Sequence, residues 1–323
     1  MEKYIQDFLS VTNTDSNEVA LYYLTVSDGD LQTAICSYFE DLNDEGCASS
    51  SSSNIGVMPS SENHNKDLVL LEWNIQGLLD DCLQLRTAAV ISEIQGLKPD
   101  IVLLQEVTAV TLMLIKVSLE NHYDIVDSRD GNVVLYFTAI LSKKTTIKVN
   151  LSRTISFSNS MQGRNVLLVE VTFKQKRAVF ITSHLESMKP QAKIRIEQLK
   201  QVANLMCSFD RSISVIFGGD TNLSASDYRA ACSSNKLKND VVDVWECLGC
   251  KEDCRYTWDL QTNDNQIKGG QARCRYERVY MRKVDPYDEA PLKPSAMQLV
   301  GTKRLSCGMF PSDHWGILTT FSY

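Results

Sequence analysis

Amide, carboxylate and histidine side chains recur in five short motifs of this chain, and four of the motifs closely follow an apolar run. The apolar runs are Leu68 to Leu71, Ile101 to Leu104, Val179 to Ile181 and Val215 to Phe217. The motifs are Trp73-Asn74-Ile75, Leu104-Gln105-Glu106-Val107, Ser183-His184-Leu185-Glu186-Ser187, Gly219-Asp220-Thr221-Asn222 and, near the end, Ser312-Asp313-His314-Trp315-Gly316. A polar residue ends most strands, but several strands that end in Asn, Glu, His and Asp are hard to obtain by chance. The pattern predicts strands that end in catalytic groups.

The same residue types suit hydrolysis of a phosphodiester. That reaction needs a cation for the developing charge, a group that orients the attacking water, and donors for the phosphate oxygens. Glu106 is a hard oxygen ligand suited to Mg²⁺, for which Mn²⁺ can substitute. Asp220 and Asn222, on a segment that we expect to be extended, would point the same way and hold a water. His184 and His314 would donate to phosphate oxygens.

Asp313 stands next to His314, so it would orient that histidine or join the metal ligands. Each residue also has an ordinary structural interpretation. Glu106 could end a surface strand, Asn74 could sit in a turn, and His184 could be a structural histidine. The Asp220 to Asn222 segment could be a loop that bonds to its own backbone. One mechanism that gives every motif a role favours the catalytic interpretation.

The composition suits a globular chain of 323 residues, 43% of them hydrophobic, with room for a sizeable core and a small accessory domain. No stretch approaches a membrane span, and residues 1–10 lack a basic start with an apolar block, so we expect no secretory signal and no membrane partner. The ten cysteines are therefore expected to be thiols. The alternative is a zinc site at Cys247, Cys250, Cys254 and Cys274, whose spacing lacks a clean second pair.

The acidic excess lies entirely in the N-terminal region. Residues 1–66 hold two Lys and 11 Asp or Glu, a balance of −9, and the whole chain carries −7, so the rest carries +2. A near-neutral region can still bind nucleic acid locally. The overall acidity is therefore weak evidence against a phosphate-rich substrate.

Composition also predicts three regions. Residues 46–66 are rich in Ser and Asn and poor in large apolar residues, so we predict a flexible linker there, with a long surface loop as the alternative. Residues 1–45 would form a helical domain and residues 67–323 the catalytic domain. Helices are predicted around Ile5, Phe8 and Leu9, over Val19 to Leu24, and around Leu31, Ile35, Tyr38 and Phe39 after an Asp28-Gly29-Asp30 turn.

The predicted third helix, residues 30–40, resembles the last helix of ubiquitin-associated domains. Its pattern is an acidic cap, Leu, two polar residues, Ala and an aromatic end. The usual Met-Gly-Phe loop is missing. Ubiquitin binding and a plain helical appendage therefore both stay open.

Beyond the linker, apolar strands alternate with amphipathic helices. We predict helices over Ala88 to Leu97 and Gln191 to Met206, and a hairpin of Val166 to Phe173 with Lys176 to Leu185. The predicted fold is α/β, a two-layer β-sandwich flanked by helices, with a small N-terminal three-helix domain.

At its motifs the chain resembles the endonuclease/exonuclease/phosphatase superfamily of Mg²⁺-dependent phosphodiesterases, and within it the 5′-tyrosyl-DNA phosphodiesterases, over residues 68–323. The Asp-Thr-Asn and Asp-His-Trp-Gly forms are the more specific motifs. The resemblance implies hydrolysis of the 5′-phosphotyrosyl bond that trapped topoisomerase II leaves on DNA, a repair activity in the nucleus and also the cytoplasm. It implies DNA with such ends as partner, ubiquitin as a further candidate, and a monomer.

Residue by residue, the resemblance implies two sets of positions. The active site would comprise Asn74, Glu106, His184, Ser187, Asp220, Asn222, Asp313 and His314, with Glu106 and Asp313 at the metal. The substrate groove would comprise Tyr136, Arg164, Trp258 and Tyr276. From the residues alone, Tyr136 and Trp258 would be core aromatics and Arg164 a solvated cation.

Three positions depart from the family pattern. Gln76 stands where Asp is usual, Met188-Lys189 replaces Thr-Arg, and Tyr276-Glu277-Arg278 replaces an aromatic-Asp-Arg. Lys lacks the bidentate fork of Arg, which puts a DNA contact in doubt, while Tyr276 keeps an aromatic face for a base. Two rival functions remain: another phosphodiesterase of the superfamily (abasic endonuclease, deadenylase or inositol polyphosphate phosphatase), or a ubiquitin-binding scaffold with an inactive catalytic fold.

Overall fold

The computed structural model describes residues 2–12, 14, 16–27, 31, 33–35, 37, 38, 67–129, 131–233, 237, 239–283 and 292–322. The predicted linker, the Asp28 to Asp30 turn and the Phe39 end of the third helix lie outside the described residues. The limits of the three predicted regions therefore stay predictions.

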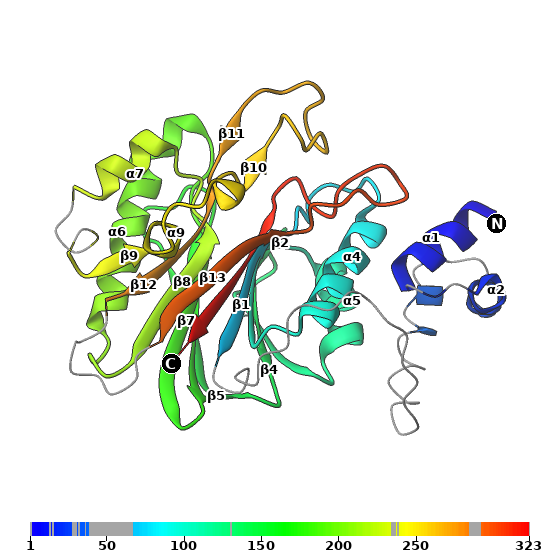
Figure 1. Ribbon diagram of the computed structural model, residues 1–323, viewed down its shortest axis with the longest axis horizontal. Coiled ribbons are helices and arrows are strands. Elements are labelled where there is room, and N and C mark those ends of the chain that lie inside the picture. Colours follow the sequence, from blue (N-terminus) through cyan, green and yellow to red (C-terminus); the bar gives the residue numbers. More distant parts are fainter. Residues whose placement is uncertain are drawn as a thin grey trace.

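Two six-stranded sheets form the centre of the molecule (Figure 1). In order across the first sheet, the strands are β13 (Lys293–Val300), β14 (Gly316–Ser322), β1 (Leu68–Asn74), β2 (Ile101–Val107), β4 (Phe137–Lys143) and β3 (Tyr123–Asp127). Across the second they are β5 (Ile147–Ser156), β6 (Asn165–Phe173), β7 (Lys176–His184), β8 (Ser214–Asp220), β12 (Glu277–Arg282) and β9 (Val241–Asp243). A short hairpin joins β10 (Trp258–Asp259) to β11 (Arg273–Cys274).

Each sheet contains a parallel pair joined by a helix. Strand β1 runs parallel to β2 through α4 (Leu83–Leu97), and β7 runs parallel to β8 through α6 (Ala192–Ser208). The other pairings are antiparallel, including the predicted β6–β7 hairpin. Lys174 and Gln175, with φ of 48° and 67°, form its two-residue turn. Helix α4 begins at Leu83, earlier than the predicted Ala88. The prediction missed this start because Leu85 is the one buried apolar residue before Ala88, which leaves no apolar repeat there.

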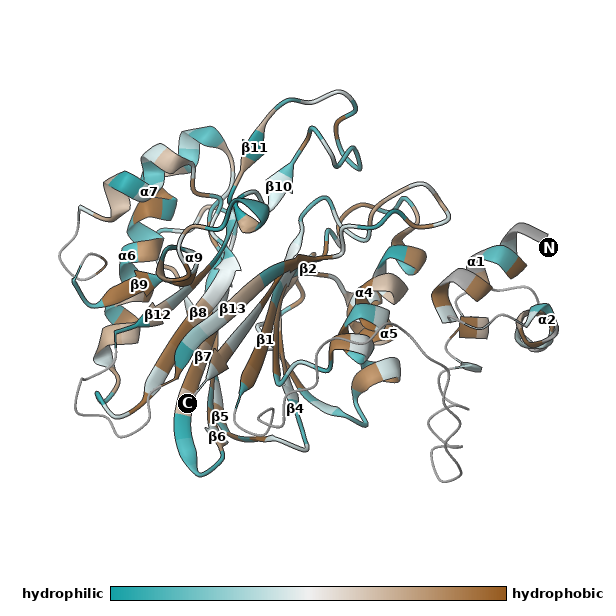
Figure 2. Ribbon diagram, viewed as in Figure 1, coloured by the Kyte–Doolittle hydropathy of each residue, from teal (hydrophilic) through white to brown (hydrophobic). Residues whose placement is uncertain are grey.

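Helices cover the outer face of each sheet, so the predicted α/β sandwich flanked by helices is confirmed. Helices α4 and α5 (Ala109–Leu119) pack on the first sheet, and α6 and α7 (Ala225–Ala231) on the second. Apolar residues of these helices belong to the same buried clusters as the strands they cover, and Figure 2 shows hydrophobic residues along both the strands and the helices. Short helical turns lie at η1 (Lys189–Gln191), α9 (Val244–Cys247) and η2 (Glu252–Cys254). In the part of the chain that is described, no helix is both long and apolar enough to cross a lipid bilayer.

Strand alternation decides which polar groups point between the sheets. In β1, Leu68 and Leu70 pack between the sheets, while Leu71 and Trp73 face α4 and α5. Successive strand residues point to opposite faces, so Glu72 and Asn74 also face the second sheet. The same alternation in β8 turns Asp220 toward the first sheet.

The sheets approach closely beside these polar groups. A Cβ atom on Gly218 of β8 would lie 2.8 Å from Leu103 Cδ1 and 3.1 Å from Glu72 Cγ. Only glycine fits at this distance without a shift of its neighbours. The contact brings the ends of β1 and β8 within hydrogen-bonding reach.

The N-terminal region is a helical unit that packs on α4. Helices α1 (Glu2–Thr12) and α2 (Asn17–Val26) are followed by helical residues at 31, 33–35, 37 and 38, which agrees with the predicted bundle. Its core includes Phe8, Leu24 and Ile35, and the same cluster contains Leu85 and Ala88 of α4. The unit is therefore docked on the catalytic domain (Figure 1).

We predict that deleting residues 1–66 lowers the melting temperature of the remaining chain by about 2–4 °C, because Leu85 and Ala88 lose their apolar cover. The uncovered surface should also promote self-association, measurable by sedimentation velocity. Adding Leu85→Gln to the deleted chain should restore a monomer. A deleted chain with unchanged melting temperature and no association would contradict the docking.

A second consequence concerns Glu72, which is fully buried between the sheets. Burial, and then the charges of Glu277 and Asp220, raise the pKa of Glu72 well above its ordinary value of 4.5. The folded chain therefore keeps this group neutral at pH values where the unfolded chain ionises it. Stability is lost as the pH rises above 4.5 toward the folded-state pKa.

We predict that Glu72→Gln, which stays neutral in both states, raises the melting temperature by at least about 2 °C more at pH 8 than at pH 5. Thermal unfolding followed by circular dichroism measures this difference. The surface substitution Glu120→Gln serves as the control. Equal changes at both pH values would show that Glu72 is not held neutral.

Candidate active site

The predicted motifs meet at one edge of the sandwich, where β1, β2, β7 and β8 end. Asn74 ends β1, His184 ends β7 and Asp220 ends β8, while Glu106 is the penultimate residue of β2. The Ser312 to His314 segment reaches the same edge just before β14 begins. Both parallel pairs therefore deliver their carboxyl ends to one place.

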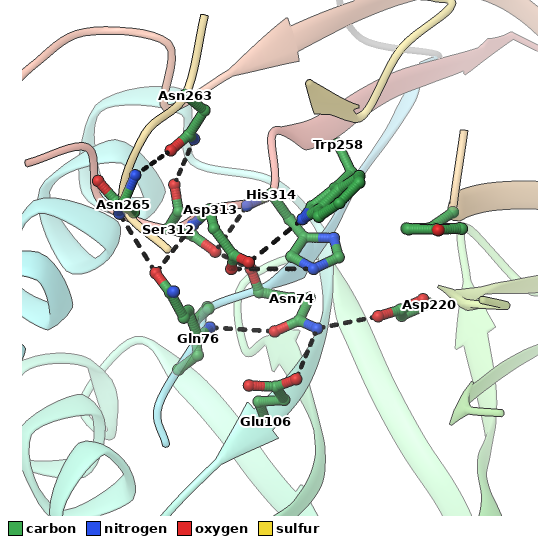
Figure 3. A network of polar contacts seen from close by, with 12 residues as sticks. Asn74, Gln76, Glu106, Asp220, Trp258, Asn263, Asn265, Ser312, Asp313 and His314 are labelled. Carbon is green, nitrogen blue, oxygen red and sulfur yellow. Dashed lines mark hydrogen bonds and ion pairs between the residues drawn. The ribbon is translucent and has the colours of Figure 1, made fainter. Parts of the chain in front are cut away.

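Asn74 joins the two sheets by hydrogen bonds. Its Nδ2 donates to Asp220 Oδ2 at 3.0 Å and to Glu106 Oε1 at 3.2 Å (Figure 3). Its Oδ1 accepts from the Gln76 amide at 3.0 Å. Asn74 is fully buried, so its amide has one fixed orientation.

A backbone irregularity turns Glu106 into the site. Gln105 points between the sheets, where its Nε2 donates to Thr182 Oγ1 at 3.0 Å, so regular alternation would direct Glu106 toward the helices. Instead, the pairing of β2 with β4 shifts between Leu104 and Val107, and Glu106 has a left-handed φ of 54°. The bulge re-aims this side chain toward Asn74.

His314 is held as a cation by a carboxylate that the motif analysis did not select. His314 Nδ1 lies 2.6 Å from Glu277 Oε1, at the start of β12. Burial opposes the charge, but Glu277 and Asp313 outweigh it and raise the pKa of His314 well above its ordinary value. Glu277 thus occupies the position of the usual Asp and still reaches the histidine.

His184 has the opposite protonation. Burial and then the charge of Arg164 lower its pKa to about 3, so its imidazole is neutral near pH 7. Its Nε2 lies 3.3 Å from Asp220 Oδ2, which assigns the proton to Nε2. Burial would raise the pKa of Asp220, but the two histidines and the hydrogen bonds from Asn74 and the Asn222 amide lower it. The expectation that His184 donates to phosphate stays a prediction, since Nε2 faces Asp220.

Asn222 differs from its predicted conformation. The chain leaves the strand at Asp220, and Asn222 has a left-handed φ of 51°. Its backbone amide donates to Asp220 Oδ1 at 3.0 Å and its Nδ2 to Leu185 O at 3.2 Å. The expectation of an extended segment was wrong, because a turn that bonds to its own side chains competes with the strand.

The Ser312 to His314 segment is anchored by a set of hydrogen bonds (Figure 3). They run from Ser312 Oγ to Asn74 O (2.6 Å), from Trp73 Nε1 to His314 O (2.9 Å), from the Asp313 amide to Gln76 Oε1 (3.0 Å) and from Asn263 Nδ2 to Ser312 O (2.8 Å). Asn265 Nδ2 also donates to Gln76 Oε1, at 3.2 Å. Asn263 and Asn265 lie in a loop without periodicity, so no signal in the sequence selects them.

Gln76, where the family has Asp, acts here as a neutral acceptor. Arg86 of α4 is fully buried beneath it and donates to backbone carbonyls of Gln76, Leu79 and Pro311. Burial lowers the pKa of Arg86. The buried Arg86 guanidinium therefore donates to backbone carbonyl oxygens and has no carboxylate at position 76 to pair with.

One flank of the site carries Tyr136 and Arg164. The guanidinium of Arg164 lies 5.0 Å from the centre of the Tyr136 ring, and that ring lies 6.1 Å from the His184 ring. Arg164 is buried, unlike the solvated cation that its sequence alone favours. Ser187 lies on this flank, where its Oγ donates to Gln162 Oε1 at 3.0 Å, and that oxygen also accepts from Arg164.

The other flank carries Trp258 and Tyr276. Their ring centres are 5.4 Å apart, and the Tyr276 ring lies 6.3 Å from the ring of His314. Trp258 Nε1 donates to Asp313 Oδ2 at 3.3 Å (Figure 3). The structure therefore brings all the predicted site residues to this edge. The Tyr136 ring lies on one side of it and the Trp258–Tyr276 pair on the other.

The oxygen donors fit a hard divalent cation. Burial, with added repulsion from Asp313 and Asp220, raises the pKa of Glu106 to about 7, and a cation would relieve this repulsion. Asp220, Glu277 and His314 also place ligand atoms within 4.8 Å of one another, but Glu277 is already paired with His314. The assignment of Glu106 and Asp313 as the metal ligands therefore stays a prediction. Among the described residues, no group of cysteines converges in this way, and none of the described cysteines forms a disulfide.

Met188 and Lys189 lie beside the site at the start of η1. Met188 is exposed with a φ of 70°, and its carbonyl accepts from Arg195 Nη1 at 2.6 Å. Whether Lys189 replaces the usual arginine in contacting DNA stays a prediction.

Comparisons with known proteins give the same architecture. Residues 71–314 match the Endonuclease/Exonuclease/phosphatase family, and residues 2–45 match the UBA-like domain. Tyrosyl-DNA phosphodiesterase 2 of Homo sapiens is 34% identical over 97% of this chain and 90% of its own length. The crystal structure of Danio rerio TDP2 complexed with single strand DNA product has a TM-score of 0.74, with 35% identity over 80% of this chain and 99% of that chain. TDP2 from Caenorhabditis elegans has a TM-score of 0.69, with 28% identity over 100% and 93%.

We predict that Glu106→Gln weakens Mn²⁺ binding at least about 10- to 100-fold. Loss of a residue that only hydrogen-bonds to a metal ligand already weakens metal binding by this factor. Because the pKa of Glu106 is about 7, binding by the unchanged chain should tighten as the pH rises through 7. The variant should lose this pH dependence. Titration calorimetry at pH 6 and pH 8 measures both effects, with Glu93→Gln of α4 as the matched control. Unchanged affinity in Glu106→Gln would exclude it from the metal site.

Proposed function

The chain belongs to the endonuclease/exonuclease/phosphatase family and is a metal-dependent phosphodiesterase, and from this premise we propose that it hydrolyses 5′-phosphotyrosyl bonds at DNA ends. The observation that carries the proposal is the cluster of buried Asn74, Asp220 and His314 with half-buried Glu106, set between two aromatic flanks. In this proposal the phosphodiester lies between these groups, with an aromatic surface for the substrate on each side. The resemblance to tyrosyl-DNA phosphodiesterase 2 supports this substrate over those of other family members.

In this mechanism, Glu106 and Asp313 would hold a divalent cation. Such a cation supplies positive charge to the phosphate oxygens during attack. The His314 imidazolium, oriented by Glu277, donates from Nε2 to a phosphate oxygen. Asp220 stays ionised and orients the attacking water, accepting its proton as the oxygen attacks phosphorus. Asn74 keeps Asp220 and Glu106 in place for these roles.

The leaving group explains why no strong acid is required. A tyrosine phenol has a pKa of about 10, far below that of the alcohols released from sugars, so it departs with little protonation. The protein can therefore place its cationic donor on the phosphate. His184 is neutral and pairs with Asp220, so this scheme does not use the predicted donation from His184 to phosphate.

The finer assignments rest on the same chemistry. Two carboxylates as ligands favour Mg²⁺, with Mn²⁺ as a substitute. Trapped topoisomerase II leaves 5′-phosphotyrosyl ends, so we propose these adducts as the physiological substrate of a monomeric enzyme. That substrate implies work in the nucleus, and in the cytoplasm as well.

We also propose that the UBA-like unit binds ubiquitin, because Leu21 and Tyr22 of α2 are exposed at 46% and 61%. Titrating labelled ubiquitin into the full chain tests this. No chemical-shift change at millimolar concentration, a range in which weak binding still registers, would favour a plain appendage.

All catalytic groups lie beyond residue 66, so deletion of residues 1–66 should leave turnover of a short oligonucleotide unchanged.

The proposed substrate is tested by a panel. We expect the purified protein with Mg²⁺ to cleave a 5′-phosphotyrosyl oligonucleotide with a kcat/KM at least about 100-fold above those for an abasic duplex, poly(A) and an inositol phosphate, a difference of roughly 2.7 kcal/mol. Faster turnover of any of the other three would assign the chain to a different activity of the family. Inactivity on all four would support the scaffold alternative.

The role of His314 gives a further prediction. His314→Ala should slow a p-nitrophenyl phosphodiester, 5′-phosphotyrosyl DNA and an alkyl diester by a similar factor, about 100- to 1000-fold, because the lost donor stabilises the phosphate. His122→Ala, at an exposed histidine outside the site, is the control. A loss that grows steeply with leaving-group pKa would instead make His314 the general acid.

A further inference from the structure

A cavity of about 410 Å³ lies beside the Tyr136 flank. Its walls come from residues 128, 129, 132 and 134–137, from Thr154 and Ser156 of β5, and from Gln162, Gly163 and Asn165. This volume is in the range of ligand-binding pockets and exceeds what one phenol ring needs. None of the catalytic roles above uses it.

The cavity adjoins the catalytic centre. A second, small cavity of about 30 Å³ contains His184 and Arg164, and it shares Tyr136, Gln162 and Gly163 with the larger one. A chain that leaves the phosphate on the His184 side therefore passes Tyr136 and enters the larger cavity. Trp258 and Tyr276 lie on the other flank, beside His314.

The lining is poorly suited to a phosphate backbone. Among the described residues that line the cavity, Arg129 alone carries a charge. Its guanidinium is already paired with Asp127, at 2.8 Å and 2.9 Å, and stacks 4.5 Å from the centre of the Phe137 ring. Nucleic-acid grooves instead track the backbone with free cations.

The same lining suits a polypeptide. Hydroxyl and amide side chains from Ser128, Thr154 and Asn165 supply uncharged hydrogen-bonding groups. Leu135, 75% exposed, contributes an apolar surface at the rim. Strand β5 is at the end of its sheet, and no strand of the described chain pairs with its outer edge, so main-chain groups are available to an extended peptide.

We propose that this cavity is a subsite for the peptide that flanks the scissile tyrosine, on the leaving-group side of the phosphate. The inference rests on the proposed function, because the peptide reaches the cavity only through a phosphotyrosyl bond. The subsite recognises an extended, mainly uncharged segment of a few residues. The enzyme therefore prefers a peptidyl adduct to a lone tyrosine.

The test compares two substrates that share one oligonucleotide. One carries a single 5′-phosphotyrosine, and the other carries the same tyrosine at the centre of an uncharged five-residue peptide. Leu135→Asn removes the apolar contact, and Thr154→Trp fills the cavity from the exposed edge strand. Leu151→Asn is the matched control. Leu151 is also an exposed leucine, but it lies in β5 and does not line the cavity. A third substrate, with four further nucleotides and no peptide, separates peptide from nucleic acid.

We expect a higher kcat/KM for the peptidyl substrate, mainly through a lower KM. The ratio of peptidyl to tyrosyl kcat/KM should fall about tenfold in Leu135→Asn and Thr154→Trp, the size of one lost leucine contact, and should persist in Leu151→Asn. A ratio of one in the unchanged chain, or a ratio that both variants leave intact, would overturn the subsite while tyrosyl turnover upholds the proposed function. The peptide subsite would also be overturned if both variants lowered kcat/KM for the substrate with four added nucleotides and left the peptidyl preference unchanged. Absence of tyrosyl turnover would refute the proposed function and this inference together.

Discussion

The hydrogen bonds of the Asn74 amide are the constraint on which the site depends. One Nδ2 group reaches Glu106 of its own sheet and Asp220 of the other sheet. Both bonds persist only if the sheets keep their separation at this edge, which the glycine at position 218 allows. The packing of the sandwich thus fixes the distance between Glu106, the proposed metal ligand, and Asp220, proposed to orient the water, without a direct bond between the two carboxylates.

Burial of charge gives the groups of the site different protonation states. Burial lowers the pKa of both histidines at this edge; at His314 the charges of Glu277 and Asp313 outweigh it, whereas at His184 the Arg164 cation adds to it. Burial raises the pKa of Glu106 to about 7, and a cation bound beside it would lower that pKa again. Neighbours rather than residue type therefore decide which side chain carries a proton.

Much of this arrangement could be predicted from the sequence, and the failures have identifiable physical causes. Strand ends at Asn74 and Asp220 follow from apolar runs and from alternation, which are local signals. The orientation of Glu106 depends on a bulge, and Asn222 adopts a turn, so alternation misplaces both. Arg86 bonds to the carbonyl of Pro311, 225 residues away, and contacts of this kind leave no pattern in the chain.

Helix α4 is shared by two parts of the molecule. It offers Leu85 and Ala88 to the N-terminal unit, and from the same turn it sends Arg86 beneath Gln76 and Pro311, next to the catalytic segment. Binding equilibria that meet on one element are thermodynamically linked. A ligand that binds the undocked N-terminal unit more tightly than the docked unit weakens docking by the ratio of those two affinities. Docking in turn weakens the binding of that ligand by the same factor.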